Sequence, residues 1–244
     1  YAKPDFGGRR YCDARVWSFF NHHKDMSRYL DWALGVDKKA TDMPLWIVPD
    51  KKLSLQDLQK DMRDHYEGTP LALDSTNIGG GIWQMPYRPT PLSFKVDGKE
   101  YFNERPTSTQ QTGFTYVSQM RSWLPREIGG VLWFGNDDGN MIAYVPIYCG
   151  NTVQPECFNT PGADAVTFSD CNAYWVCNWV SNMVYPRYSQ MFPSLKQVRD
   201  SLENSYISQQ PAVEQKANSL YEKNKAEALN YLNNYSNQQA QQML

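Results

Sequence analysis

The chain has 244 residues, enough for a sizeable hydrophobic core, and its formal net charge is −2. This charge balance excludes the basic surface that binds nucleic acid or an anionic membrane, and no apolar run approaches the ~20 residues of a membrane span. Aromatic residues make up 14% of the chain, with 8 Trp and 16 Tyr, and we expect most of these rings to lie in the core.

From Asp13 to Gly35, apolar residues recur at near-helical intervals, which predicts a helix that ends at Gly35. His22 and His23 lie in its middle. A histidine pair can bind a metal or act as a base, but no other ligand lies nearby at a suitable spacing. We therefore expect a solvated helix junction at this pair.

The segment from Leu53 to Tyr66 has the clearest helical pattern of the chain, with Ser54 as the N-cap and Asp57 three residues later. Asp61 and Asp64 are expected on the solvated face of this helix.

Residues 69–91 are dense in glycine and proline and predict a loop. Arg88 in this loop is a candidate clamp for the carboxylate of a substrate. The alternative is that Arg88 ties the loop together through a backbone carbonyl.

The sequence Val96-Asp97-Gly98-Lys99 predicts a β-hairpin. Two further strands, at about Thr107–Arg121 and Gly130–Phe134, are expected to pair antiparallel. Asp137 and Asp138 follow them. Adjacent side chains of a strand point apart, so these two would not act as one acid–base pair, and the Asp-Asp-Gly-Asn run is typical of a turn.

The stretch Thr109-Gln110-Gln111-Thr112 places four uncharged polar side chains in the first of these strands. Thr109 and Gln111 would face one side of the sheet, and Gln110 and Thr112 the other. Because buried polar groups need partners, the row predicts either an internal hydrogen-bond network or the floor of a polar pocket. Arg105 adds a fixed cation suited to a carboxylate.

Three helices are predicted in the last third of the chain: Ser169–Tyr185 with Ser169 as its cap, Leu195–Tyr206, and a long helix from Pro211 to about Gln242. The first is apolar on most of its surface, so we expect it to be buried on several sides or to pack on a segment outside this chain. Strands gathered between about residues 94 and 150, with helices on either side, predict an α+β fold.

The five cysteines lack metal-ligand spacing; they are Cys12, Cys149, Cys157, Cys171 and Cys177. Cys149 and Cys157 could close a short disulfide in an oxidising compartment. Buried free thiols are the favoured interpretation for all five.

Several ordered motifs run along the chain. They are Asn103-Glu104-Arg105, TQQTGF at 109–114, Leu124-Pro125, GGVLWFG at 129–135 and Asp137-Asp138, with further matches at 53–70, Asp74, 85–88, 146–148 and around Trp175. In these motifs the chain resembles the cysteine-type N-terminal-nucleophile (Ntn) dipeptidases, the dipeptidase A family, over about residues 10–240.

In that family the nucleophile is a cysteine at the mature N-terminus, and the α-amine of the same residue is the general base. This chain begins with Tyr1. We therefore expect the catalytic cysteine on an absent segment or on a separate chain. The resemblance implies a four-layer αββα sandwich, in which residues 1–244 form the C-terminal portion of a single peptidase domain, with a strand-rich core at about 94–150 and a helical region at about 165–242.

The activity that the resemblance implies is hydrolysis of dipeptides or similar small amides by a thiol peptidase without a metal or cofactor. Its partners would be a dipeptide or small peptide and the segment that carries the cysteine, and the sequence allows a homo-oligomer. The candidate site residues are Arg105, to orient the nucleophile or stabilise the oxyanion; Thr109, Gln110, Gln111 and Thr112, to line the pocket; and Arg88 and Asp74, to bind the carboxylate and ammonium ends of the substrate. The Asp-Asp pair of the family also raises a role for Asp137 or Asp138.

Two other classes of function are compatible with the residues. One is a papain-like enzyme in which an internal cysteine works with His22, His23 or His65. The other is a non-catalytic module that binds a glycan or a peptide through exposed Trp and Tyr side chains. The sequence leaves the compartment open among cytoplasm, periplasm and secretion.

Overall fold

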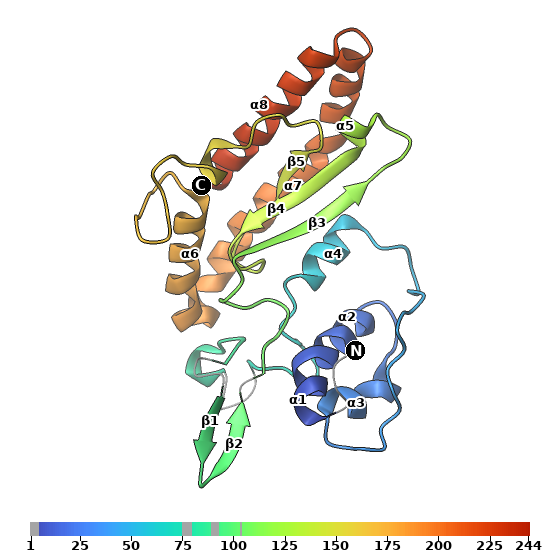
Figure 1. Cartoon of the computed structure of the whole chain (residues 1–244), viewed down its shortest axis with the longest axis vertical. Coiled ribbons are helices and arrows are strands. Elements are labelled where there is room, and N and C mark those ends of the chain that lie inside the picture. The colour runs from blue at the N-terminus through green and yellow to red at the C-terminus, as the bar shows by residue number, and fades with distance from the viewer. Residues whose placement is uncertain (1–4, 75–79, 89–92, 103) are drawn as a thin grey trace. The chain divides into compact units, whose positions relative to one another are not determined.

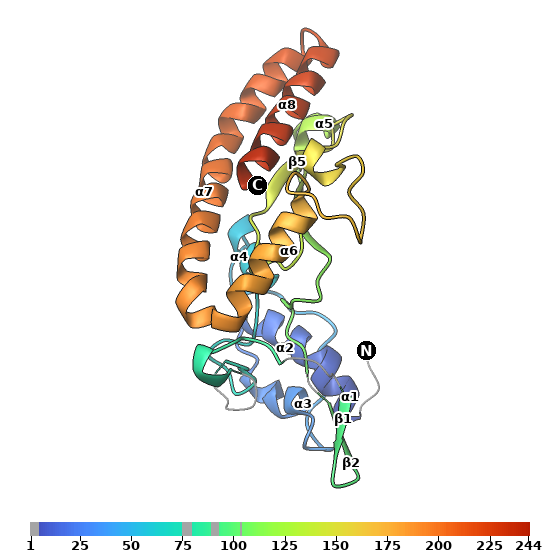
Figure 2. The ribbon, with the colours of Figure 1, turned by 90° about the vertical axis from the view of Figure 1, so that its left-hand side faces the viewer.

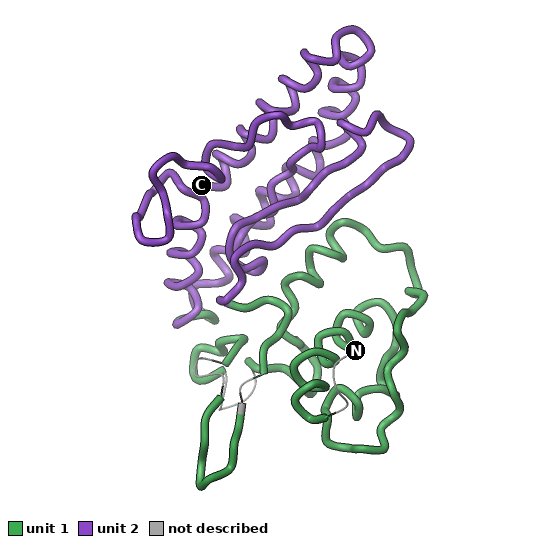
Figure 3. Tube along the Cα trace, viewed as in Figure 1, with its two compact units in different colours: residues 1–109, 187–189 green, residues 110–186, 190–244 purple. Residues whose placement is uncertain are grey.

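The computed structural model describes residues 5–74, 80–88, 93–102 and 104–244. The chain forms two compact units (Figure 3). Unit 1 comprises residues 1–109 and 187–189, and unit 2 comprises residues 110–186 and 190–244.

Unit 1 begins with a series of short helical segments. They are α1 (Phe6–Gly8), the π-helical turn η1 (Arg9–Asp13), α2 (Ala14–Asn21), the 3₁₀ turn η2 (Ser27–Tyr29) and α3 (Leu30–Leu34). The predicted single helix is interrupted after Asn21, because the side chains of Asn21 and Asp25 accept hydrogen bonds from the backbone N–H groups of Met26 and Ser27. Gly35 ends α3 with a left-handed φ of 75°, as predicted.

The core of unit 1 gathers around aromatic side chains of these helices and of the segment that follows them. Trp17, Met26, Trp32, Tyr66 and Leu73 are all buried in it. The Nε1 of Trp17 donates to the Met26 carbonyl at 2.9 Å, so the buried indole keeps a hydrogen-bond partner. The prediction that aromatic rings lie in the core is confirmed for Trp17 and Trp32.

The helix predicted from residue 53 is α4 (Leu55–Asp61), and it is shorter than predicted. Ser54 and Asp57 form the expected capping box, in which each side chain accepts a hydrogen bond from the backbone N–H of the other residue. The expected solvated face is wrong, because Asp61 and Asp64 are only 2% and 3% exposed.

The predicted hairpin is confirmed as β1 (Ser93–Val96) and β2 (Lys99–Phe102), which pair antiparallel after the 3₁₀ turn η3 (Gly81–Trp83). Asp97 and Gly98 connect the strands with φ values of 51° and 76°. Positive φ at both positions belongs to the type I′ turn, whose twist matches that of the strands.

Unit 2 is built on a three-stranded antiparallel sheet of order β3-β4-β5 (Figure 1). Its strands are β3 (Phe114–Met120), β4 (Gly130–Asn136) and β5 (Val145–Tyr148), with the short helix α5 (Arg126–Gly129) between the first two. The predicted antiparallel pairing of β3 and β4 is confirmed.

The start of β3 corrects the prediction for the polar row. The last paired residues of β3 and β4 are Phe114 and Asn136, so the chain before Phe114 has no partner on β4. Gln110 and Gln111 form a turn instead of strand. The side chains of residues 109–112 therefore do not alternate across a sheet.

Helices α7 (Tyr188–Tyr221) and α8 (Lys225–Met243) form an antiparallel pair that covers one face of this sheet (Figures 1 and 2). An ion pair of 2.5 Å joins Arg121, at the end of β3, to Glu214 on α7, and Ser236 on α8 donates to the Pro146 carbonyl on β5. The hydroxyl of Tyr206 on α7 donates to a carbonyl of α8 at 3.1 Å.

Pro211 lies inside α7 and does not start a helix, so the break between the two predicted helices is corrected: it follows Tyr221 and does not precede Pro211. A proline in a helix costs about 3 kcal/mol. Contacts on both sides of Pro211 offset this cost, because Gln210 donates to Gln119 of β3 and Glu214 pairs with Arg121. Helix α7 ends at Tyr221, and α8 begins after its N-cap Asn224. The side chain of Asn224 accepts hydrogen bonds from two backbone N–H groups of α8.

The opposite face of the sheet is open along β3, but on β5 it is covered, because Val145 is buried against Cys157, Ala173 and Ala240. Phe114, Tyr116 and Met120 on β3 are 60%, 50% and 65% exposed, and the ring of Phe114 stacks on those of Tyr116 and Phe134. On the covered face, Val117 and Trp133 are buried. The sheet therefore has one covered face and one face that is exposed along β3.

Helix α6 (Ala173–Val184) follows a loop that contains the 3₁₀ turn η4 (Glu156–Phe158), and it runs into a further 3₁₀ turn, η5 (Tyr185–Arg187). Its cap is Asn172, which accepts from the backbone N–H of Trp175, and not Ser169 as predicted. Ala173, Cys177, Ser181 and Val184 form its buried side.

The mixed α+β class predicted from the order of elements is confirmed. In the described part of the chain, no helix has both the length and the apolar character that a membrane crossing requires. All five cysteines are free thiols, so Cys149 and Cys157 form no disulfide. Only Cys157 and Cys177 are buried, and the expected burial of the other three is wrong.

Candidate active site

Arg105, the predicted catalytic arginine, is half-buried in unit 1. Its backbone carbonyl accepts a hydrogen bond of 3.1 Å from the hydroxyl of Tyr66. Burial raises the pKa of the Tyr66 phenol, so this hydroxyl stays protonated and able to donate. The guanidinium of Arg105 lies over the ring of Tyr11, 5.7 Å from its centroid. Tyr66 thus holds the backbone of Arg105, and Tyr11 lies against its guanidinium.

Arg88, the predicted carboxylate clamp, is held by a carboxylate of the protein itself. Glu104 accepts from Nη2 of Arg10 at 2.5 Å and from Nη2 of Arg88 at 3.3 Å. The Nε of Arg88 lies 3.2 Å from Glu104 Oε2 without the alignment of a hydrogen bond. Arg88 Nη1 is buried and has no hydrogen-bond partner among the described residues.

The electrostatics of this Arg10–Glu104–Arg88 cluster keep its carboxyl ionised. Burial opposes ionisation, but the backbone N–H of Glu104 and the charges of Arg88 and Arg10 hold the pKa of the carboxyl below its ordinary value. Two guanidinium groups therefore share one carboxylate, and the cluster keeps one positive charge in excess.

The other predicted substrate-binding residues lie in less regular segments. Asp74 is half-buried, and its carbonyl oxygen lies 2.0 Å from the position that a Cβ on Gly80 would occupy, so the chain passes itself closely there. Residues 75–79, which follow Asp74 in this loop, lie outside the described residues.

The boundary between the two units falls within the polar row, so Thr109 belongs to unit 1 and residues 110–112 belong to unit 2. Thr109, Gln110 and Thr112 are half-buried, and Gln111 is exposed. The carbonyl of Gly113 accepts from the backbone N–H of Asp137 at 2.9 Å. This bond ties the end of the polar row to the Asp-Asp motif.

Asp137 and Asp138 are both buried, and their carboxylates have different partners, as the prediction that they do not form one acid–base pair requires. Asp137 accepts from the hydroxyl of Ser181 and from Nδ2 of Asn178. Burial raises the pKa of Asp137, and these two hydrogen bonds oppose the rise. Asp138 accepts from the hydroxyl of Tyr185.

Asn136 is a candidate that the sequence reasoning missed. It is the last residue of β4, directly before the Asp-Asp motif, and its Oδ1 is buried without a hydrogen-bond partner among the described residues. A buried acceptor without a partner is costly, so such atoms often mark a site whose partner comes from elsewhere. The sequence signal that could have identified Asn136 is its place directly before the Asp-Asp motif, at the end of a strand.

His23 is buried and His22 is half-buried in unit 1, which corrects the predicted solvated junction. Asp61 accepts from Nδ1 of His22 at 2.8 Å and from Nε2 of His23 at 2.7 Å, and Asp64 lies 3.4 Å from Nε2 of His22. Hydrogen bonds to Asp61 and Asp64 raise the pKa of His22 to about 9. No group of three or more His, Cys, Asp and Glu side chains in the described ranges is arranged to hold a metal ion.

The thiols of the described chain give no support to the papain-like alternative. Burial raises the pKa of Cys157 to about 11 and that of Cys177 to about 12, so both stay as unreactive thiols at neutral pH. His65 pairs with Glu67 at 3.0 Å, and the other two histidines pair with Asp61. Within the described residues, no cysteine is hydrogen-bonded to a histidine.

Comparison with known proteins shows which family the chain matches. A model described as peptidase family C69 matches residues 1–201. A probable dipeptidase B of Streptococcus pyogenes serotype M1 is 25% identical over 183 residues, which are 74% of this chain and 34% of that protein. Dipeptidase A of Lactobacillus helveticus is 25% identical over 150 residues, which are 62% of this chain and 26% of that protein. The chain thus matches about a third or less of the length of these relatives.

Proposed function

Because the chain belongs to peptidase family C69, we propose that it supplies substrate-pocket and supporting residues to an enzyme that hydrolyses dipeptides or similar small amides. The nucleophile in this proposal is an N-terminal cysteine outside these 244 residues. Its thiolate attacks the carbonyl carbon, and its α-amine takes the thiol proton and passes it to the leaving amine. Water then hydrolyses the thioester and releases the acid.

A surplus of positive charge in the Arg10–Glu104–Arg88 cluster carries the substrate-binding part of the proposal. Within this cluster, two guanidinium groups share one carboxylate. The N–H groups of Arg88 Nη1 have no acceptor among the described residues. Such a site suits the carboxylate end of a dipeptide. Asp74 would bind the ammonium end, and residues 109–112 would serve as pocket lining.

Arg105 is the proposed catalytic residue of this chain. Its backbone is fixed by Tyr66 and its guanidinium rests on Tyr11, so its charge would meet the nucleophile or the oxyanion without reorganisation. Asn136 in unit 2 offers a separate polar group, because its buried Oδ1 can accept a hydrogen bond from an ammonium or amide N–H brought by the rest of the enzyme.

The exposed face of the unit 2 sheet supports the four-layer αββα arrangement. Phe114, Tyr116 and Met120 expose an apolar strip on β3 that only Ser118 interrupts, while the other face of the sheet is already covered by α7 and α8. A second sheet packed on this strip would complete the sandwich, with residues 1–244 as the C-terminal portion of one peptidase domain.

The test is a dipeptide hydrolysis assay on the complete protein with Arg105→Ala. Loss of a charge that acts on the transition state should lower turnover by about 100-fold or more while the melting temperature changes little. Arg28→Ala is the matched control, because Arg28 also lies over a tyrosine ring, 4.9 Å from the Tyr29 centroid, but is exposed. Unchanged turnover in Arg105→Ala would remove this residue from the site.

A further inference from the structure

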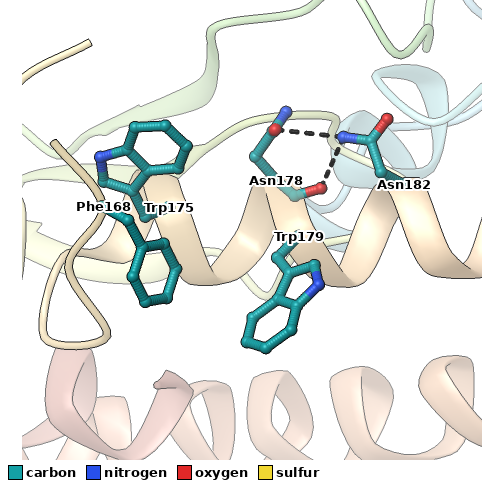
Figure 4. A pocket seen from close by; sticks show the side chains of 5 residues that line it. All are labelled: Phe168, Trp175, Asn178, Trp179 and Asn182. Atoms are coloured by element: carbon teal, nitrogen blue, oxygen red, sulfur yellow. Dashed lines mark hydrogen bonds between the residues drawn. The ribbon is translucent and has the colours of Figure 1, made fainter. Parts of the chain in front are cut away.

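Helix α6 carries a cavity that none of the proposed catalytic residues lines. Trp175, Asn178, Trp179 and Asn182 recur at helical spacing on one face of α6, and Phe168 from the preceding loop completes the lining (Figure 4). The cavity has a volume of about 400 Å³. This is the size of a site for a small organic molecule.

Three aromatic rings form the apolar part of this cavity. The centroid of Phe168 lies 5.8 Å from those of both Trp175 and Trp179, with steep angles between the ring planes. Trp179 and Phe168 are 59% and 53% exposed. Large ring faces left open to solvent around a hollow are typical of binding sites rather than of core packing.

Two carboxamides form the polar part, and the protein holds them in place. Nδ2 of Asn182 donates to the backbone carbonyl of Asn178 at 2.8 Å and to its Oδ1 at 3.1 Å (Figure 4). Nδ2 of Asn178 donates in turn to the buried carboxylate of Asp137 at 3.1 Å. This chain of hydrogen bonds orients both amides before a ligand arrives.

A donor and an acceptor at this cavity remain available to a ligand. In the described part of the chain, Asn182 Oδ1 and Trp179 Nε1 take part in no hydrogen bond. The loop wall is also fixed, because Trp175 Nε1 donates to the Asp164 carbonyl at 3.0 Å. The side chain of Asp164 accepts from the backbone N–H of Val166 at 2.8 Å.

We propose that this cavity binds a neutral pyranose sugar. No charged side chain lines it, so it lacks the cation that a phosphate or carboxylate ligand requires and the anion that an ammonium requires. The carbon-bound hydrogens of a sugar ring suit the open faces of Trp179 and Phe168, and its hydroxyl groups can both donate to Asn182 and accept from Trp179. An apolar peptide side chain would fill the same space but leave those two polar groups without partners.

The test titrates the complete protein with cellobiose and with N,N′-diacetylchitobiose, followed by saturation-transfer difference NMR and calorimetry. At least one of these neutral disaccharides should bind. Trp179→Ala should weaken its binding by about tenfold or more, since the stacked ring is lost. Trp179→Phe keeps a ring and loses only the donor, so it should retain part of the affinity.

Trp123→Ala is the matched control, because Trp123 lies in unit 2, outside the cavity, and is 77% exposed. It should leave sugar binding unchanged. Absence of binding by both sugars to the folded chain, or binding that survives Trp179→Ala, would overturn the proposal. So would binding of N-acetyl-phenylalaninamide that depends on Trp179 when neither sugar binds, which would assign the cavity to an apolar peptide side chain.

Discussion

The free energy of unfolding of unit 1 should depend on pH through the cluster of His22, His23, Asp61 and Asp64. His22 contacts Asp61 and Asp64, and its side chain is 20% exposed. Its pKa is raised from an ordinary 6.5 to about 9. At about 1.4 kcal/mol per pKa unit, this rise corresponds to roughly 3 kcal/mol of stabilisation by the protonated form of His22.

The sign follows from the raised pKa. Protons bind His22 more tightly in the folded chain, so its contribution is complete below pH 6.5 and disappears as the pH rises through about 9. Stability of unit 1 should therefore fall between these two pH values. Asp61→Asn removes the carboxylate that both histidines share, so it should return the pKa of His22 toward 6.5 and flatten this dependence.

The pKa of His22 can be measured by NMR titration of the ring C–H signals. The chain has 3 histidines, so the signal of each can be resolved. A His22→Gln variant assigns the signal of His22. Hydrogen exchange of peptides from α2 and α4, corrected for the intrinsic effect of pH, then measures the stability of unit 1.

Glu67→Gln is the control, because Glu67 pairs with His65 and not with His22. It should leave the titration of His22 unchanged. A His22 signal that titrates near its ordinary pKa in the unaltered chain, or a stability that stays constant from pH 6.5 to 9, would refute this reasoning.

Three further variants test single contacts by chemical denaturation or melting. Arg121→Ala leaves Glu214 buried without its counter-charge and should cost about 3–5 kcal/mol, more than Glu214→Gln, which keeps a hydrogen-bonding side chain. Gly80→Ala places a Cβ 2.0 Å from the Asp74 carbonyl oxygen, so the backbone must shift and the melting temperature of unit 1 should fall, whereas alanine at the open position Gly113 should be tolerated. Asn224→Ala removes the cap of α8 and should cost about 1 kcal/mol, and Asn224→Asp should restore most of it.

Interactions between residues a few positions apart could be predicted from the sequence. The capping box of Ser54 and Asp57, the turn at Asp97-Gly98 and the end of α3 at Gly35 all lie where the residues indicate. Each depends on a local backbone geometry that one or two side chains favour. The α+β class and the antiparallel pairing of β3 with β4 followed from the same local patterns placed in order.

The predictions were wrong where contacts with residues distant in the chain outweighed a local preference. Pro211 is typical of a helix start, yet α7 runs through it because Gln210 bonds to Gln119 on β3 and Glu214 pairs with Arg121, directly after that strand. Asp61 has the position of a solvated helix residue, yet two histidines 38 and 39 positions away bury it.

By itself, then, the sequence determined the family and most of the element types, since ordered motifs and periodicity are properties of neighbouring residues. Only the tertiary structure decided which charges are paired and which polar atoms are left over: Arg88 with Glu104, His22 with Asp61, and the buried Oδ1 of Asn136. These outcomes depend on burial and on distances between residues remote in the chain, and a residue's own neighbours carry no record of either.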